Sequence, residues 1–198
     1  MSNSYIEHKK YPHLAIPIKR YELTKKICLL GDPSVGKTSL IRRFVLDEFE
    51  DSYITTIGTK VTKKEVLVPV SSRQMEVYLT LMIWDVAGQQ EYKMFHRMYL
   101  KGVEGVFSVC DLTRKETVNS MKKYVTVVKE NVGDVPIVFL FNKADLTDSI
   151  EVQVDDVRKV ESFKQIPCYK TSAKSGENVN DAFVTLSRAL VDIWLAKY

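Results

Sequence analysis

One stretch of the chain limits its possible folds more than any other, the run Gly31-Asp32-Pro33-Ser34-Val35-Gly36-Lys37-Thr38. It matches the pattern of a phosphate-binding loop, and it follows the apolar run 27–30 and precedes a helical pattern, as such a loop requires. Glycines let the backbone wrap closely, so that successive N–H groups point at phosphate oxygens where a helix begins. We therefore expect Lys37 to bridge the terminal phosphates of a nucleotide and the Thr38 hydroxyl to bind Mg²⁺.

The alternation of apolar and helical segments predicts the fold class. Short apolar runs are typical of buried strands, and they occur at 27–30, 77–84, 103–111, 137–141 and 167–171. Apolar residues at helical spacing indicate helices within 37–45 and 178–195. The pattern predicts an α/β fold of the phosphate-loop class, with a mostly parallel, doubly wound, six-stranded sheet and helices on both faces. Segments 66–70 and 77–81 flank Ser71-Ser72-Arg73 and predict a hairpin, which gives the sheet one antiparallel edge strand.

Length and charge suggest one domain with a basic extension. The 198 residues fit a single core. Residues 1–24 contain Pro12 and Pro17 and show no sustained period, so we expect an extension of uncertain order, followed by a nucleotide-binding domain over 25–198. The net charge of +4 is concentrated in residues 1–26, which carry six basic and two acidic residues. A nucleic-acid partner is therefore not expected, because it would require a concentrated basic face on the folded domain.

The cysteines and the absence of targeting signals suggest a cytoplasmic protein. Cys28, Cys110 and Cys168 are odd in number and lie in or beside apolar runs, so they are expected to be buried reduced thiols. The N-terminus does not resemble a signal peptide, and no run of about 18 apolar residues exists. The C-terminus offers no cysteine for prenylation, so we expect at most peripheral contact with a membrane.

A second motif indicates which base is bound. Asn142-Lys143-Ala144-Asp145 follows the predicted strand 137–141, and the Asp145 carboxylate is suited to accept hydrogen bonds from both N1–H and the exocyclic amine of guanine. Adenine presents no such pair of donors, so a carboxylate rejects it. A weaker third signal is Thr171-Ser172-Ala173-Lys174 after the last predicted strand, where a loop supplies backbone N–H groups to the guanine carbonyl.

These motifs, in this order and spacing, resemble the Ras-like small GTPases, and particularly the Rab branch, over about residues 25–196. Asp85-Val86-Ala87-Gly88-Gln89 is similar to the family's Asp-x-Ala-Gly-Gln, and Trp84 precedes it as in Rab proteins. The resemblance implies that Asp85 holds Mg²⁺ through water, that the Gly88 N–H contacts the terminal phosphate and that Gln89 orients the attacking water.

The resemblance also assigns the other site residues. Thr56 aligns with the switch threonine that binds Mg²⁺, whereas Thr55 is the rival that the family's Thr-Ile-Gly pattern does not select. Phe49 stands at the position that stacks on guanine and Tyr53 at the one that closes over the phosphates, with a core role as the alternative for both. The catalytic set is Lys37, Thr56, Gly88 and Gln89, and the metal set is Thr38, Thr56 and Asp85. The nucleotide-binding set is Gly31, Asp32, Pro33, Ser34, Val35, Gly36, Lys37, Thr38, Ser39, Phe49, Tyr53, Thr56, Gly88, Asn142, Lys143, Asp145, Leu146, Ser172, Ala173 and Lys174.

Three features depart from the family. Pro33 replaces a glycine or small residue, and the resemblance implies that its ring lies near the space that Gln89 needs. The rate of hydrolysis is therefore left open by the motif, whereas nucleotide binding is expected to survive. Val61 replaces the aromatic residue that Rab proteins offer to effectors beside Trp84 and Tyr99, and the hairpin around 71–74 is longer than in typical Rab proteins. No arginine is obviously placed in cis to reach the terminal phosphate, because Arg42 and Arg43 lie on the following helix and are expected to be solvated or ion-paired.

The resulting hypothesis is a Mg²⁺-dependent switch that binds GTP and hydrolyses it slowly to GDP and phosphate. Its implied partners are effectors, exchange factors and GTPase-activating proteins, and a monomer is expected. The alternative is a GTP-binding scaffold with lost or very slow hydrolysis. A nucleotide kinase is much less consistent with the motifs, because it would have no use for 142–145 or Gly88-Gln89. The compact end of the chain suggests a prokaryotic or archaeal Rab-like protein.

Overall fold

The computed structural model describes residues 18–49, 59–86, 99–155 and 163–197. Six strands form one sheet in the order β2-β3-β1-β4-β5-β6. The strands are β1 (Lys19–Gly31), β2 (Thr59–Val70), β3 (Met75–Val86), β4 (Gly105–Asp111), β5 (Ile137–Asn142) and β6 (Cys168–Lys170), and the helices within the described ranges include α2 (Lys37–Leu46), α4 (Lys115–Asn131) and α6 (Val179–Lys197). Short 3₁₀ turns span Ser71–Arg73 and Thr147–Ser149.

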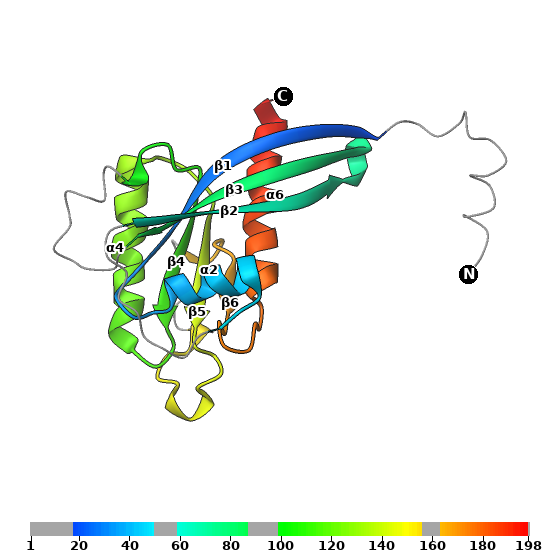
Figure 1. Cartoon of the computed structure of the whole chain (residues 1–198). Coiled ribbons are helices and arrows are strands. Elements are labelled where there is room, and N and C mark those ends of the chain that lie inside the picture. Colours follow the sequence, from blue (N-terminus) through cyan, green and yellow to red (C-terminus); the bar gives the residue numbers. More distant parts are fainter. Residues whose placement is uncertain (1–17, 50–58, 87–98, 156–162, 198) are drawn as a thin grey trace.

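The pairing of the strands confirms the predicted fold class. β1 pairs in parallel with β3 and β4, and β4, β5 and β6 continue the parallel sheet. β2 pairs antiparallel with β3 at the edge, joined to it by the turn at Ser71–Arg73. Figure 1 shows α4 on one face of the sheet and α2 and α6 on the other.

Side chains from the helices fill the core on both faces. On one face, the Phe183 ring of α6 stacks on Phe44 of α2 at 3.9 Å and tilts against Phe107 of β4 at 4.5 Å between ring centroids. On the other face, Met121 and Val125 of α4 are buried against the sheet. The two helices predicted within 37–45 and 178–195 are therefore confirmed, because each buries one apolar face.

β1 begins earlier than the sequence pattern suggested. The expected boundary between residues 24 and 25 falls inside this strand, which starts at Lys19 and pairs with β3 from Met75 onward. Tyr21 and Leu23 pack against the core cluster beneath α6, and the Tyr21 ring lies 5.4 Å from the Trp194 ring. In Figure 1, β1, β2 and β3 extend together away from the rest of the sheet, alongside α6. Residues 19–24 are thus part of the folded domain.

The three cysteines are free thiols, as predicted. Cys28 and Cys110 are buried in strands, and Cys168 is half-buried. Burial raises the pKa of the Cys28 thiol to about 12, although the nearby Lys26 opposes the shift. A thiol with so high a pKa is unreactive at neutral pH.

Candidate functional site: a phosphate loop and a base-binding turn

The phosphate loop lies between the end of β1 and the start of α2, and two glycines give it its shape. A Cβ on Gly31 would stand 2.4 Å from the carbonyl oxygen of Val109. Gly36 has φ of +95°, and a Cβ there would stand 2.3 Å from Nδ2 of Asn142. Since L residues with side chains rarely adopt such a φ, only glycine fits the entry to α2. The loop therefore brings the N-terminus of α2 to the carboxyl end of the parallel strands.

Lys37 is the buried cation of this loop. Its Nζ donates to the carbonyl oxygens of Gly31 at 2.7 Å and Asp32 at 2.9 Å. Burial lowers the pKa of Lys37 to about 8, whereas the carboxylates of Asp85 and Asp32 oppose this shift and the positive charge of Arg114 adds to it. The ammonium group is thus held inside the loop at a pKa sensitive to any anion placed beside it.

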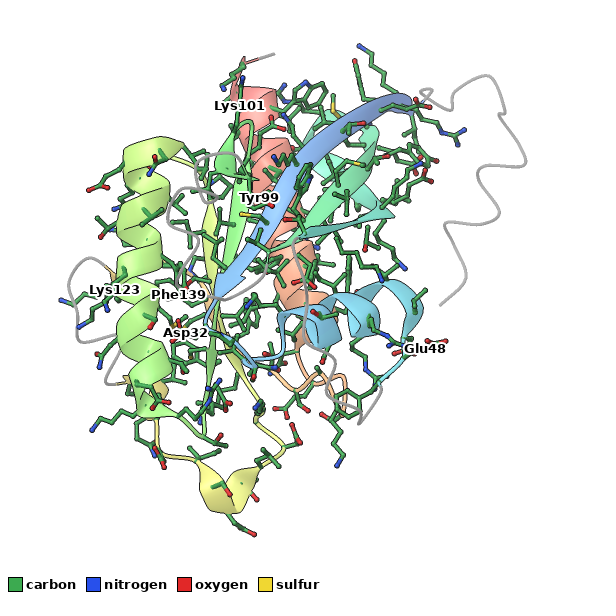
Figure 2. The ribbon with its side chains drawn as sticks, turned by 60° about the vertical axis from the view of Figure 1, so that its left-hand side comes forward. Asp32, Glu48, Tyr99, Lys101, Lys123 and Phe139 are labelled. Atoms are coloured by element: carbon green, nitrogen blue, oxygen red, sulfur yellow. The ribbon has the colours of Figure 1, made fainter. Side chains whose placement is uncertain are left out.

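Asp32 connects the loop to α4. It is almost fully buried, and its Oδ1 accepts a hydrogen bond from the Tyr124 hydroxyl at 3.1 Å. Figure 2 shows Asp32 between α4 and α2, below Tyr99 and Lys101. The loop is therefore braced against the helix on the other face of the sheet.

The Thr38 hydroxyl and the Asp85 carboxylate lie together beside Lys37 and offer oxygen atoms that could serve as metal ligands. The Thr38 hydroxyl donates to Oδ2 of Asp85 at 2.5 Å, while Oδ1 of Asp85 is buried and has no hydrogen-bond partner among the described residues. Burial raises the pKa of the Asp85 carboxyl, although the Thr38 hydrogen bond and Lys37 oppose the shift. Mg²⁺ prefers oxygen ligands of this kind and keeps several waters, so an orphaned carboxylate oxygen next to a hydroxyl fits its site.

Asn142 joins the base-binding turn to both neighbouring loops. Its Nδ2 donates to the Val35 carbonyl at 2.8 Å, and its Oδ1 accepts from the Ala173 N–H at 3.2 Å. Ser172 is buried, and its hydroxyl donates to Oδ1 of Asp145 at 2.6 Å. The structure therefore brings together the three motifs that the sequence singled out, although the phosphate loop is more than a hundred residues away from the other two in the chain.

The remaining predicted residues take varied positions. Phe49 is half-buried and packs against the core cluster around Phe183, and its stacking on guanine stays a prediction. Lys174 and Leu146 are exposed, and Ser39 is half-buried on α2. Tyr53, Thr56, Gly88 and Gln89 lie outside the described residues.

Two charged residues near the site, Asp111 and Arg114, were not predicted from the sequence. Asp111, at the end of β4, pairs with Lys143 at 2.6 Å and with Arg114 at 3.0 Å. Arg43 donates to the carbonyls of Ala173 at 2.9 Å and Lys174 at 2.6 Å, and it pairs with Asp47, so it is ion-paired as expected. A carboxylate at the end of a buried strand could have marked Asp111 as a candidate site residue. Its pairing with Lys143 could not have been predicted, because no sequence motif links the two positions.

The fold and the site define a nucleotide-binding α/β protein of the phosphate-loop class. Comparison with known proteins gives the family, because the model of the Ras family matches residues 26–192. The dog Ras-related protein Rab-13 is 34% identical over 174 residues, which cover 87% of this chain and 83% of that protein. SEC4 of Saccharomyces cerevisiae is 33% identical over 87% of this chain and 77% of its own length, and mouse Rab-22A is 34% identical over 83% and 82%.

The chain belongs to the Ras family and resembles its Rab members. It is a GTP-binding regulatory switch that hydrolyses GTP, and proteins of this family are generally Mg²⁺-dependent. Within the described residues, none of the helices has the length and apolar character needed to cross a membrane.

Proposed function

We propose that this chain holds Mg²⁺-GTP in the pocket around Lys37, Asn142 and Asp145, and that hydrolysis there resets its interaction with partner proteins. The observation that carries the proposal is the double hydrogen bond of Asn142 to the Val35 carbonyl and the Ala173 N–H. The Asn142 side chain thereby fixes the distance between the phosphate loop at 31–38 and the loop at 171–174. Such a fixed span suits a ligand with a base at one end and phosphates at the other.

Lys37 and the N-terminus of α2 would bind the phosphates. In this proposal, phosphate oxygens replace the Gly31 and Asp32 carbonyls as acceptors for Nζ of Lys37. A charged acceptor makes a stronger hydrogen bond than a neutral carbonyl. The backbone N–H groups from Ser34 to Ser39 would add donors around the same anion, where the helix dipole favours negative charge.

Asp145 would select guanine. Its Oδ1 is held by the Ser172 hydroxyl at 2.6 Å, so the carboxylate has a fixed direction. The two donors of guanine satisfy a carboxylate, whereas adenine would leave it unpaired, and a site built to hydrogen-bond its ligand rejects such a mismatch by a factor on the order of 10⁴. Lys143 and Lys174 would lay their aliphatic stems along the base.

Thr38 and Asp85 would hold Mg²⁺, with Thr56 as a further ligand and Asp85 acting through water. The supporting observation is that Oδ1 of Asp85, beside the Thr38 hydroxyl, has no hydrogen-bond partner in the part of the chain that the structure describes. When bound, the ion neutralises charge on the phosphates. Gln89 would orient the attacking water, Gly88 would contact the terminal phosphate and Tyr53 would close over it, as the family resemblance implies. These residues would make the pocket sensitive to the third phosphate.

The proposed partners are effectors, exchange factors and GTPase-activating proteins that distinguish the GTP form from the GDP form. We further propose that the chain acts as a monomer in the cytoplasm, with at most peripheral contact with membranes. The similarity to Rab proteins supports the kinds of partner, whereas their identities follow from no residue described above.

Single-turnover hydrolysis of Mg²⁺-GTP tests the proposal, with ATP in parallel. We expect slow turnover of GTP only, because the family resemblance implies a slow intrinsic rate that an arginine supplied in trans accelerates. Gln89→Leu should lower the rate further and retain GTP affinity. Equal rates of GTP hydrolysis in the wild type and in Gln89→Leu would mean that another residue orients the attacking water. Tight GTP binding without turnover in either protein would favour the scaffold alternative and point to Pro33 as the cause.

A further inference from the structure

A second buried charge cluster lies directly behind the phosphate loop, at the junction of β4 and α4. Its centre is Asp111, whose side chain is fully buried. Oδ1 accepts from the N–H and hydroxyl of Thr113 at 3.0 and 2.7 Å, and Oδ2 accepts from Arg114 and Lys143. Burial alone would raise the pKa of Asp111, but the hydrogen bonds from Lys143 and Thr113 outweigh it and hold the pKa below its usual value. Asp111 is therefore a fixed anion with two cations attached.

Arg114 connects this anion to the phosphate loop. Its Nε donates to Oδ2 of Asp111 at 3.0 Å, and its Nη2 donates to the carbonyl oxygen of Pro33 at 2.8 Å. The backbone of Arg114 is also anchored, because its carbonyl accepts from the N–H and hydroxyl of Thr117 at 3.1 and 2.7 Å. Arg114 is thus fixed by its backbone carbonyl and by its Nε, which leaves Nη2 to bind the phosphate loop.

The bond to Pro33 determines the direction of the next N–H group. In a trans peptide the C=O and the following N–H point in opposite directions, because the unit is planar. No cis peptide occurs among the described residues, so a Pro33 carbonyl pulled toward Arg114 turns the Ser34 N–H away from it. Ser34 has φ of +64°, which is unfavourable for a residue with a side chain and requires support from its surroundings. Arg114 supplies part of that support.

Arg114 also contributes charge at this position. Its guanidinium is one of the groups that lower the pKa of Lys37, so its positive charge is felt at the phosphate-binding ammonium. Its side chain is 34% exposed, and among the described residues only two of its five N–H donors have partners. Arg42 and Arg43 are used elsewhere, on Glu48 and on the loop at 173–174.

We propose that Arg114 is a positioning residue for the nucleotide phosphates: it holds the Pro33 carbonyl so that the Ser34 N–H faces the phosphate cradle, and it adds a positive charge there. Asp111 shares its carboxylate between Arg114 and Lys143, so the same anion positions the phosphate loop and the base-binding turn. This inference rests on the proposed nucleotide site and adds to it a residue that the family motifs do not contain.

Nucleotide dissociation from the full chain tests the proposal. The protein is loaded with fluorescent methylanthraniloyl GDP or GTP and chased with excess unlabelled nucleotide. Arg114→Ala should raise both dissociation rates by about tenfold, GTP at least as much as GDP, because one charge-assisted support of the loop is lost. Arg114→Lys keeps the charge and one donor, and it should recover part of the loss. Lys115→Ala removes the adjacent exposed cation, which is the first residue of α4, and should match the wild type.

Urea unfolding in saturating GDP separates positioning from general stability. An unchanged dissociation rate in Arg114→Ala would overturn the proposal. So would equal increases of the dissociation rate in Arg114→Ala and Arg114→Lys that parallel the decreases of their urea midpoints. Either result leaves the nucleotide site intact if the wild type and Lys115→Ala bind GTP tightly. Absence of binding in the wild type would instead contradict the proposed function itself.

Discussion

At the scale of single residues, the lowered pKa of Lys37 makes nucleotide binding dependent on pH. Burial places this pKa at about 8 in the described structure. Below pH 8 Lys37 is already charged, so its contribution to phosphate binding is constant. Above pH 8 the free protein loses the proton and must regain it when phosphate binds, because the anion raises the pKa again. GTP affinity should therefore fall as the pH rises through 8, by up to about tenfold per pH unit.

Titration calorimetry at about pH 9 in two buffers of different ionisation enthalpy measures this uptake directly. We expect most of one proton to be taken up per GTP bound, and almost none at about pH 7. Equal heats in both buffers at the higher pH would show that Lys37 keeps its proton in the free protein.

Asp145 provides a second prediction at this scale. Asp145→Asn replaces one carboxylate oxygen by an amide donor, so the side chain no longer accepts both guanine hydrogen bonds. Preference should move from GTP toward xanthosine triphosphate by a factor of about 10² or more. Competition binding with the two nucleotides gives the ratio, and Asp148→Asn, on an exposed residue of the same loop, is the control. An unaltered ratio would remove Asp145 from base recognition.

At the scale of elements, Gly36 decides how α2 meets the base-binding turn. Gly36→Ala adds a Cβ 2.3 Å from Nδ2 of Asn142, so that side chain must move and its bond to Val35 breaks. Gly133→Ala is a matched control, because Gly133 has φ of +93° but a Cβ there would meet no atom of the described residues within 4 Å. Both substitutions carry the backbone cost of about 1 kcal/mol, and Gly36→Ala should cost about 1–3 kcal/mol more.

Urea unfolding measures the two costs, and nucleotide affinity gives the second readout. Only Gly36→Ala should weaken GTP binding, because only its side chain displaces Asn142. Equal losses of stability and binding in both variants would mean that the φ angle alone, and not the contact, restricts this position.

The elements that the sequence predicted well are those with local signals. The phosphate loop and α2 follow from a continuous motif, and α6 from a regular apolar face, because both patterns are complete within one segment. α4 was not predicted individually, since two of its buried residues, Thr117 and Ser120, are polar and weaken the helical period. The roles of Arg114 and Asp111 depend on contacts with Pro33 and Lys143, which are distant in sequence, so no local pattern predicts them.

At the scale of the whole molecule, the start of β1 sets the boundary of the domain. Residues 19–24 pair with 75–80 of β3, and Tyr21 and Leu23 contact the core. Removing residues 1–24 should therefore lower the free energy of unfolding by about 2–3 kcal/mol relative to removing residues 1–17, from the lost burial of two apolar side chains. GTP affinity should not change, because the phosphate loop lies at the other end of β1. Equal urea midpoints for the two deletions would place the boundary after residue 24.

The register of β2 and β3 gives the molecule a mechanical property. Thr59, the first residue of β2, is paired with Val86, the last residue of β3, and the ladder continues without a break to Val70 and Met75. A slip of one residue would turn every side chain to the wrong face, so the two strands resist sliding past each other. The segments that contain Thr56 and Gln89 are attached at the same rung of this ladder. The register therefore keeps the two points of attachment, Thr59 and Val86, opposite each other, so that neither can shift along its strand without the other.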